Sequence, residues 1–455
     1  MPEEKAGEKV ELLNQTVQMS ARHLSAPEHK PHPQSSGTGE HEVAIDELTA
    51  EALEPPRILR ALRHVNFRKM WVGNFLSNIG TFMQNVAQGW LVLELTNSAY
   101  WLGVVSFAAA APMLVFGLIG GVIADHLDRR KLLIATQIAS MLSAFVLAAL
   151  VFSHTVQVWH VIACAFVTGV ASALGAPSQQ ALLPMLVPRE DITNAVGLNS
   201  AQFNLSRVLG PTIGGFSMAI FGSGGNFLLN GLSFLALIIA LMQVKLPEMV
   251  VPHETDFWIK LKEGFRYTLA DRRLRELIEV VIVGSLFGVP YLSFVPYFAR
   301  DVLHVGERGL GILMAFSGLG AFIAAVTVAY LGRFRQRGMF ILVNGVMCFV
   351  AIIGFTFSRN FLLSGLLQMV AGFCLILMVA AINTRLQLLA SDVMRGRVMS
   401  IYTSCYLGLP PLGSYLAGHL SKWISPAHAI AGMAAVGIVG ISLIFAVRSE
   451  LRTLD

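Results

Sequence analysis

Arg207 is the residue whose type and position carry the most chemical information in this sequence. It lies about twelve residues into a long apolar segment, or about 18 Å along a helix that rises about 1.5 Å per residue, near the middle of a bilayer. A charge at that depth costs several kcal/mol unless it faces a wet cavity or a partner. We therefore expect the guanidinium either to contact an anionic group of a bound molecule or to sense the protonation of a nearby acid. The alternative is a structural arginine that donates to backbone carbonyls.

Uncharged polar side chains gather on one face of two segments. On segment 70–95 this face covers an arc of about 100°, because each helical residue is rotated by about 100° from the last. A shorter face of the same kind follows on segment 195–221. In lipid such faces must look inward, so the two segments are predicted to line one cavity. The predicted lining residues are Asn74, Asn78, Asn85, Gln88, Asn199, Gln202 and Ser206.

Acids are scarce at the depth where a proton relay would need them. Every Asp and Glu of the apolar segments lies near a segment end, as Glu94, Glu276 and Glu279 do. Glu94 and Glu279 are titratable groups near the two membrane surfaces, and an interfacial position alone can account for each. The four cysteines lie within apolar segments and show no paired ligand spacing, so no metal site and no cofactor are predicted.

Twelve apolar segments must position these side chains. Each has about 20 residues or more, the length with which a helix crosses about 30 Å of hydrocarbon. With 55% hydrophobic residues and a mean hydropathy of +0.63, the chain lies far outside the range of soluble proteins. The sequence predicts an all-α membrane protein whose twelve transmembrane helices cover 70–95, 99–123, 131–153, 157–181, 195–221, 224–244, 275–299, 309–331, 338–358, 361–386, 396–420 and 425–447.

Basic residues alternate between the two ends of these helices. From Arg57 onward one side holds 24 Lys and Arg, and the other holds Arg300, Arg308, Arg359 and Lys422. The positive-inside rule places the first side, with both termini, in the cytoplasm. We expect a monomeric, multi-pass protein of the cell membrane. Because the charges form no separate basic domain, we expect the lipid bilayer as a partner and no nucleic acid.

The chain divides into four predicted regions. Residues 1–56 hold eleven acids against four basic residues and lack apolar periodicity, which predicts a disordered acidic cytoplasmic tail. Two six-helix halves, 57–244 and 274–455, follow on either side of the linker 245–273. The linker is predicted to form an amphipathic helix on the cytoplasmic membrane surface, because apolar and basic residues recur in it at helical spacing. Matching glycine and proline positions near the fifth and eleventh segments predict that the halves are pseudo-repeats.

The connection between the second and third segments resembles the cytoplasmic signature of the major facilitator superfamily. Residues 121–131 read Gly-Val-Ile-Ala-Asp-His-Leu-Asp-Arg-Arg-Lys. The resemblance implies a gating motif made of Gly121, Asp125, Arg129 and Arg130, in which the aspartate pairs with Arg129 or with a helix end of the other half. Asp128 departs from the family pattern, which usually has glycine there, and His126 stands where arginine is common. An ordinary charged turn is the alternative.

The fifth segment carries a second signature. Residues 206–215 read Ser-Arg-Val-Leu-Gly-Pro-Thr-Ile-Gly-Gly, which resembles the antiporter motif of facilitator-family exporters with serine in place of a leading glycine. Its proline lacks a backbone donor and loosens the helix, and its glycines allow close helix contact. The motif residues are Arg207, Gly210, Pro211, Gly214 and Gly215. A role in packing alone is the alternative.

Three further stretches, 88–98, 175–184 and 395–400, are similar to the bacterial branch that includes enterobactin exporters and macrolide or multidrug efflux proteins. The resemblance implies a secondary transporter and not an enzyme. It further implies a proton-coupled exporter of an amphipathic, drug-like or siderophore-like molecule that works by alternating access between the halves. Glu94 and Glu279 are the candidate acids for that coupling. An importer or uniporter of a small metabolite and a non-transporting membrane receptor or scaffold are the alternatives. A primary pump is disfavoured because the sequence has no Gly-x-x-x-x-Gly-Lys-Ser/Thr loop.

Overall fold

The helices of the structure follow the predicted segments closely. The computed structural model describes residues 57–126, 128–244, 257–331 and 338–447, without the side chains of 57–58, 114–115, 117–126, 257–261 and 329–331. The first half contains η1 (Arg57–Arg63), α3 (Val65–Thr96), α4 (Ala99–His126), α5 (Arg129–Phe152), α6 (Val158–Leu182), η2 (Leu183–Leu186), η3 (Arg189–Asp191) and α7 (Ile192–Gln243). The second contains α8 (Phe257–Ala270), α9 (Arg272–Val283), η4 (Gly284–Gly288), η5 (Val289–Phe294), α10 (Val295–Tyr297), η6 (Phe298–Val302), α11 (Gly306–Leu331), α12 (Gly338–Phe357), α13 (Phe361–Leu389), α14 (Asp392–Gly408), α15 (Pro410–Leu420) and α16 (Pro426–Val447).

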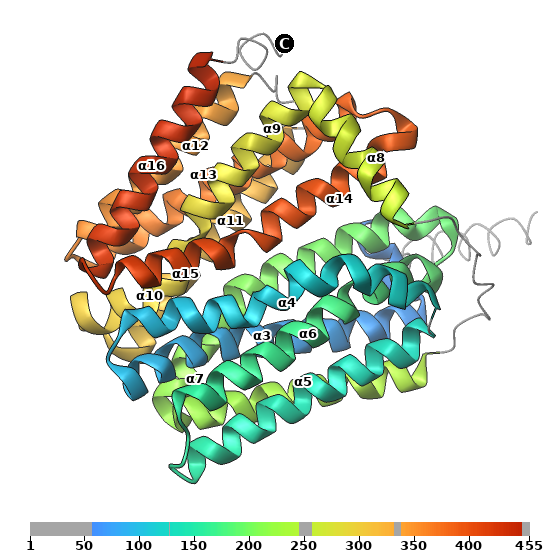
Figure 1. Ribbon diagram of the computed structural model, residues 1–455. Coiled ribbons are helices and arrows are strands. Elements are labelled where there is room, and N and C mark those ends of the chain that lie inside the picture. Colours follow the sequence, from blue (N-terminus) through green and yellow to red (C-terminus); the bar gives the residue numbers. More distant parts are fainter. Residues whose placement is uncertain (1–56, 127, 245–256, 332–337, 448–455) are drawn as a thin grey trace, which may run out of the picture. The chain divides into compact units, whose positions relative to one another are not determined.

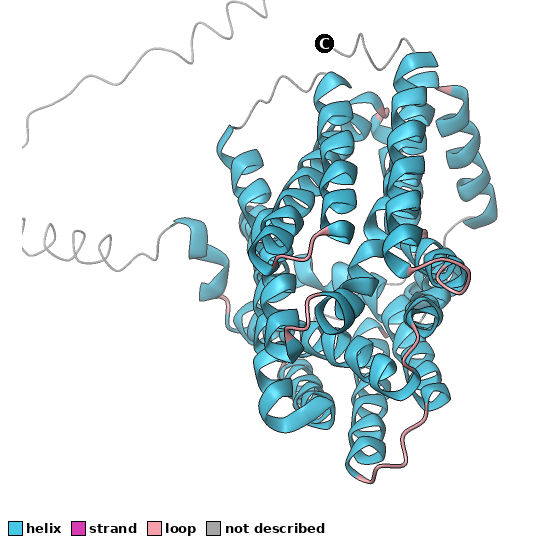
Figure 2. Cartoon of the chain, turned by 90° about the vertical axis from the view of Figure 1, so that its left-hand side faces the viewer, coloured by secondary structure: helices cyan, strands magenta, loops and turns pink. Residues whose placement is uncertain are grey.

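The predicted fold class is confirmed. Within the described residues the chain forms helices and no strand (Figure 2), and each of the twelve predicted segments coincides with helical chain. Eight of the described helices are long and apolar enough to cross a membrane by length and composition alone. One of these eight includes α7, which holds two predicted segments joined at Gly222, whose φ of +68° suits a residue without a side chain.

Two of the predicted segments are interrupted helices. The seventh runs through α9, the π-helical turn η4, the 3-10 turn η5 and the short α10 and η6, and it contains Pro290 and Pro296. The eleventh divides at Leu409 into α14 and α15, just before Pro410 and Pro411. Prolines lack the backbone N–H that an α-helix needs, so the hydrogen-bond ladder breaks at these places.

The two halves repeat one packing scheme. In the first half α4 packs on α6, and α5 packs on both α6 and α7; in the second, α11 packs on α13, and α12 packs on both α13 and α16. The halves meet most extensively along two helix pairs, α7 with α11 and α4 with α15, and also where α4 contacts α14 and η5 and where α3 contacts α10 and α11. Figure 1 shows α15 alongside α4. We call the end of the bundle at which α3 begins the tail side and the opposite end the far side.

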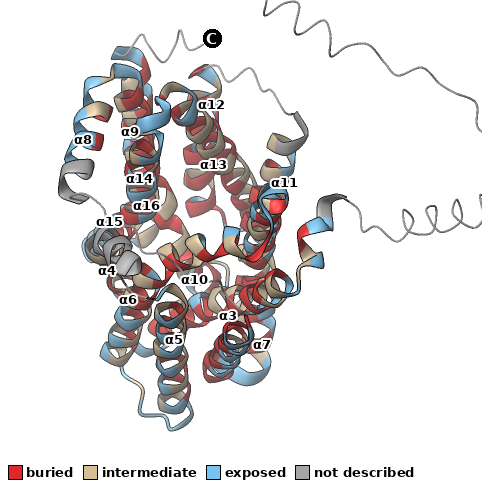
Figure 3. Ribbon diagram, turned by 90° about the vertical axis from the view of Figure 1, so that its right-hand side faces the viewer, coloured by how far each residue is buried: buried red, intermediate tan, exposed pale blue. Residues whose placement is uncertain are grey.

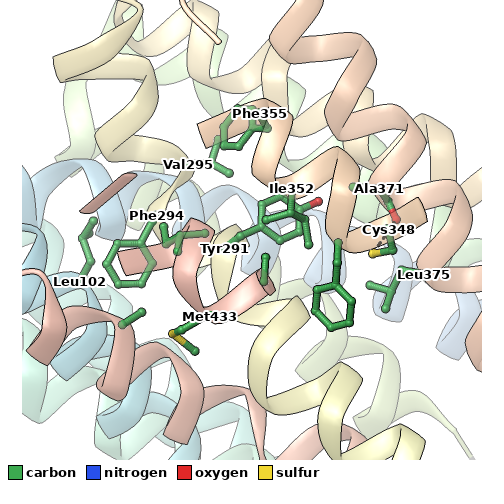
Figure 4. Close-up of a cluster of buried hydrophobic side chains, with 14 of the residues drawn as sticks. Leu102, Tyr291, Phe294, Val295, Cys348, Ile352, Phe355, Ala371, Leu375 and Met433 are labelled. Atoms are coloured by element: carbon green, nitrogen blue, oxygen red, sulfur yellow. Dashed lines mark hydrogen bonds between the residues drawn. The ribbon is translucent and has the colours of Figure 1, made fainter. Parts of the chain in front are cut away.

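Large apolar side chains form both the core and the outer surface. Figure 3 shows exposed positions alternating with buried ones along the outer helices, and Phe166, Leu228 and Val350 are among the exposed residues. In lipid such side chains need no cover. Figure 4 shows part of the core, where aromatic rings of the second half pack together and Leu102 of α4 lies beside Phe294 of η5. The core is thus continuous across the two halves on the far side.

Part of the predicted linker helix is present as α8. Residues 245–256 and the acidic tail 1–56 lie outside the described residues. Helix α8 packs on the beginning of α14, where Glu263 forms an ion pair with Arg397 and the Tyr267 hydroxyl accepts a hydrogen bond from the Ser391 N–H at 3.3 Å. Phe265 and Leu269 are exposed on its other face. Its predicted place on a membrane surface stays a prediction.

Candidate functional site

A cavity of about 330 Å³ lies between the two halves. Both halves contribute to its wall: α3, α4 and α7 from the first, and η5, α10 and α11 from the second. Its lining is mainly apolar, with Leu102, Val105, Leu292 and Met314 among the larger side chains. The polar lining residues are Asn85, Gln88, Ser106, Arg207, Ser293 and Ser317. A concave apolar space with a few convergent polar groups is the usual form of a small-molecule site.

The antiporter-like motif presents three faces to three different neighbours. Gly210 and Gly214, one turn apart, lie against α3, where a Cβ on Gly210 would come within 2.4 Å of Phe82 Cβ. Arg207 and Pro211, also one turn apart, face the cavity. Gly215 faces α11, and a Cβ there would lie 2.6 Å from Gly311 Cα. The motif therefore sets the distance of α7 from two helices and leaves its arginine on the cavity.

Arg207 is partly buried, and the described residues provide its guanidinium with no hydrogen bond and no ion pair. The cavity-lining residues that the structure describes include no Asp or Glu. One hydroxyl pair at the cavity is Tyr291 with Ser317, whose oxygens lie 3.4 Å apart. A charge in such a place interacts strongly with any ionic group that enters, because the effective dielectric constant is low.

The other predicted lining residues lie nearer the tail side, between α3 and α7. Asn78 Nδ2 lies 3.5 Å from Gln202 Oε1, and Gln202 in turn donates to Asn199 Oδ1 at 3.3 Å. Ser206 is fully buried and donates to the Gln202 carbonyl at 2.8 Å. Asn74 is buried too. Of the predicted set, the structure thus brings Asn85, Gln88 and Arg207 together on the cavity and gathers the others in the α3–α7 contact.

The two acids predicted for proton coupling lie at opposite ends of the bundle. Glu94, at the far-side end of α3, is exposed and accepts a hydrogen bond from Trp90 Nε1 at 2.8 Å. Glu279, in the tail-side part of the seventh predicted segment, has its Oε1 3.7 Å from Arg275 Nε. Glu276 was not singled out as a candidate, yet it is fully buried, and its Oε1 lies 3.3 Å from Arg272 Nε. The four-residue spacing of Arg272 and Glu276 was the only sequence signal for it.

The gating motif is described only in part. Gly121 and Asp125 belong to α4, but their side chains lie outside the described residues. Arg130 donates to the carbonyls of Leu241 and Met242 at 2.8 and 2.6 Å, so it caps the end of α7 within its own half. Arg129 begins α5 beside it. The gating role of the motif stays a prediction.

The contacts that we describe between the halves gather on the far side. A Cβ on Gly103 of α4 would lie 2.4 Å from the Ser414 carbonyl oxygen of α15, and the Gly215–Gly311 contact is similarly close. Arg300 of η6 donates to Asn97 Oδ1 at 2.8 Å, and Lys422 Nζ lies 3.6 Å from the centre of the Tyr100 ring. Arg300 and Lys422 are two of the four basic residues on the side that is poor in Lys and Arg, and both contact residues of the other half. These contacts were not predicted from the sequence.

Comparisons with known proteins agree with this architecture. Residues 58–455 match a family described as transmembrane secretion effector. The chain is 25% identical over 346 residues to the staphyloferrin A transporter of Staphylococcus aureus, covering 75% of this chain and 86% of that protein. It is 28% identical over 382 residues to the multidrug efflux pump Tap of Mycolicibacterium fortuitum, covering 81% and 92%.

A solved structure gives the same fold independently of sequence. The nucleoside transporter NupG superposes with a TM-score of 0.67 at 12% identity, covering 84% of this chain and 98% of that one. The family match spans the two halves, the cavity and all the contacts described between them. The chain therefore belongs to the transmembrane secretion effector family of the major facilitator superfamily and is a multi-pass membrane transporter.

Proposed function

We propose that this transporter is a secondary exporter that carries an amphipathic small molecule, drug-like or siderophore-like, out of the cell in exchange for protons. The observation that carries the proposal is the cavity shared by the two halves, with a mainly apolar wall and a few hydrogen-bonding groups. Such a wall suits a molecule with an apolar body and a polar part. The export direction is supported by the antiporter-like motif at the cavity and by the relatives whose names describe efflux or export.

The proposed mechanism is alternating access by a monomer. The far-side contacts through Gly103, Gly215 and Gly311 hold the halves together at one end, so a molecule would load from the tail side in this state. The excess of basic residues on the tail side supports its placement in the cytoplasm, together with both termini. Release on the far side then requires α7 to part from α11 and α4 to part from α15, which rigid movement of the halves would accomplish.

Protons are proposed to act away from the cavity, because the cavity-lining residues that the structure describes include no acid. Glu94 on the far side and Glu279 on the tail side remain the candidates, and the burial of Glu276 adds a third. An acid outside the cavity would influence the molecule indirectly, by changing which state of the two halves is favoured.

Transport in inverted membrane vesicles tests direction and coupling together. Vesicles from an efflux-deficient strain are energised with an inside-acid pH gradient, and a panel of siderophores, macrolides and dyes is offered outside. At least one compound should accumulate inside vesicles that hold the transporter, and a protonophore should abolish the accumulation. Vesicles treated with an inhibitor of nucleotide hydrolysis control for primary pumps. Accumulation only in right-side-out vesicles would identify an importer and overturn the proposal.

A further inference from the structure

We propose that Arg207 binds the anionic group of the transported molecule, so that the site takes amphipathic organic anions such as carboxylates or acidic phenols and rejects lipophilic cations. The inference rests on the proposed function for the movement of the molecule but concerns binding alone. The charge of Arg207 would distinguish two chemical classes, organic anions and lipophilic cations, that an uncharged apolar cavity would bind equally well. Siderophore-like acids belong to the first class and cationic dyes to the second.

The charges around the cavity carry the inference. Arg207 is the one residue with a permanent charge among the lining residues that the structure describes, and they contribute no acid to neutralise it. An arginine remains protonated under all ordinary conditions. An anion that enters would therefore find a guanidinium that no described residue holds by a hydrogen bond or an ion pair. A cation would meet a like charge at close range, which disfavours its binding in a desolvated site.

The two other roles expected for this arginine receive less support. A structural arginine would donate to backbone carbonyls, and no described carbonyl accepts a hydrogen bond from it. Arg130 shows in the same chain how such an arginine behaves, since it donates to two carbonyls of α7. A sensor of a nearby acid would need a carboxyl group at the cavity, and Glu94, Glu276 and Glu279 are not among the lining residues.

Arg207 also lies where a bound anion would be close to both halves of the protein. Gly318 of α11 packs against the backbone at Arg207, where a Cβ would lie 3.3 Å from its carbonyl oxygen. Ser317, beside that glycine, lines the same cavity, as does Ser293 of η5. An anion on the guanidinium would therefore lie at the boundary between α7 and the second half. A planar guanidinium can hold a carboxylate through two parallel hydrogen bonds, which fixes the orientation of the molecule as well as its charge.

Three probes that share one body test the inference. Pyrene carrying a butanoate, a butanamide or a butyl-trimethylammonium chain differs only in the end group and its charge. Binding is measured by equilibrium dialysis against the full-length protein in nanodiscs, with empty nanodiscs subtracted. The wild-type protein should bind the butanoate at least about tenfold more tightly than the amide, a difference of about 1.4 kcal/mol, and the cation most weakly. Equal or tighter binding of the cation to the wild type would overturn the inference without any variant.

Variants then assign the preference to the residue. Arg207→Met should reduce the butanoate preference to within about twofold of the amide, and Arg207→Lys should keep part of it, because a lysine retains the charge and loses the planar fork. The matched control is Arg359→Met, which removes an exposed arginine between α12 and α13 and should leave all three affinities unchanged. A butanoate preference that survives in Arg207→Met would place the anion site elsewhere and overturn the assignment. If the butanoate binds but neither it nor any compound of the transport panel is moved under a pH gradient, the inference stands and the proposed export fails.

Discussion

Asp128 illustrates how one residue can depart from a family pattern for a local structural reason. It stands where the superfamily signature usually has glycine, and its carboxylate accepts hydrogen bonds from the backbone N–H groups of Arg130 and Lys131 at 2.9 and 3.2 Å. It is therefore the N-cap of α5. A capping carboxylate satisfies donors that have no partner within the helix and also lies at the positive end of the helix dipole.

We predict that Asp128→Ala lowers stability by about 1 kcal/mol, the usual loss on removing an N-cap, and leaves transport per folded molecule unchanged. Asp128→Ser keeps a capping oxygen and serves as the matched control. The thermal unfolding midpoints of the purified variants, with transport measured at equal membrane abundance, decide the matter. Lost transport at unchanged stability would instead make Asp128 part of the gating motif.

The position of a side chain on the cavity was predictable from the sequence where helix periodicity alone decides which way the side chain points. Arg207, Asn85 and Gln88 lie on the cavity because each is on the polar face of an otherwise apolar helix. Asn78 and Gln202 share those faces but are covered where α3 and α7 meet, which depends on how two helices cross. The burial of Glu276 and the Arg300–Asn97 contact likewise depend on how separate helices pack.

At the scale of helices, α7 carries one of the two close helix contacts between the halves on the far side. Gly215 meets Gly311 there so closely that neither position has room for a side chain. Gly197 lies on the same helix nearer the tail side, and a Cβ there would meet nothing within 4 Å. The two glycines thus differ in surroundings while sharing one helix and one intrinsic conformational preference.

A pair of alanine substitutions uses this difference. Gly215→Ala should force α7 and α11 apart, at the cost of about 1–3 kcal/mol that is typical of overpacking, and should reduce transport about tenfold or more. Gly197→Ala should transport like the wild type. Far-side opening is read from the labelling rate of a cysteine placed at Ser293, using a membrane-impermeant thiol reagent. Unchanged labelling and transport in Gly215→Ala would show that the glycine contact does not hold the far side closed.

Helix bounds were predicted to within a few residues in most segments because the apolar segments of a membrane protein have a length imposed by the bilayer. The irregular elements were harder to predict from the sequence. The break at Leu409 has a sequence signal in the two prolines that follow it, whereas the π-helical turns η4 and η6 have none that we recognised. A short connection was predicted near Gly222, and in the structure this single residue with positive φ turns the chain within α7.

At the scale of the whole molecule, the described residues from Ile58 onward form one compact unit that contains both halves. The family match begins at the same residue, 58, so the acidic tail lies outside the matched region. The sequence predicted two halves from matching glycine and proline positions, and the repeated packing of α4 on α6 and of α11 on α13 follows that scheme. How the halves close on one side could not be predicted, because it depends on contacts between them.

Deletion of residues 2–50 should leave transport within about twofold of the wild type, because the many charged and few apolar residues of this segment predict no role in a rigid gate. Transport is compared at equal membrane abundance, and a scrambled tail of the same composition serves as the control. A complete loss of transport with normal insertion would identify the tail as a gate or a docking element. If transport is lost with the scrambled tail as well as on deletion, the tail acts through its particular sequence and not through its composition.

The guanidinium on the cavity has an electrical consequence for the transport cycle. When the site is empty, the moving part of the protein carries one positive charge that no described lining residue cancels; when an organic anion is bound, the pair is neutral. A membrane potential acts with about 2.3 kcal/mol per elementary charge per 100 mV on a charge that crosses the whole field. On the proposed export of an organic anion, an inside-negative membrane potential would then act little on the loaded step and would favour the return of the empty site toward the cytoplasm. The voltage would drive the reset of the transporter rather than the export itself.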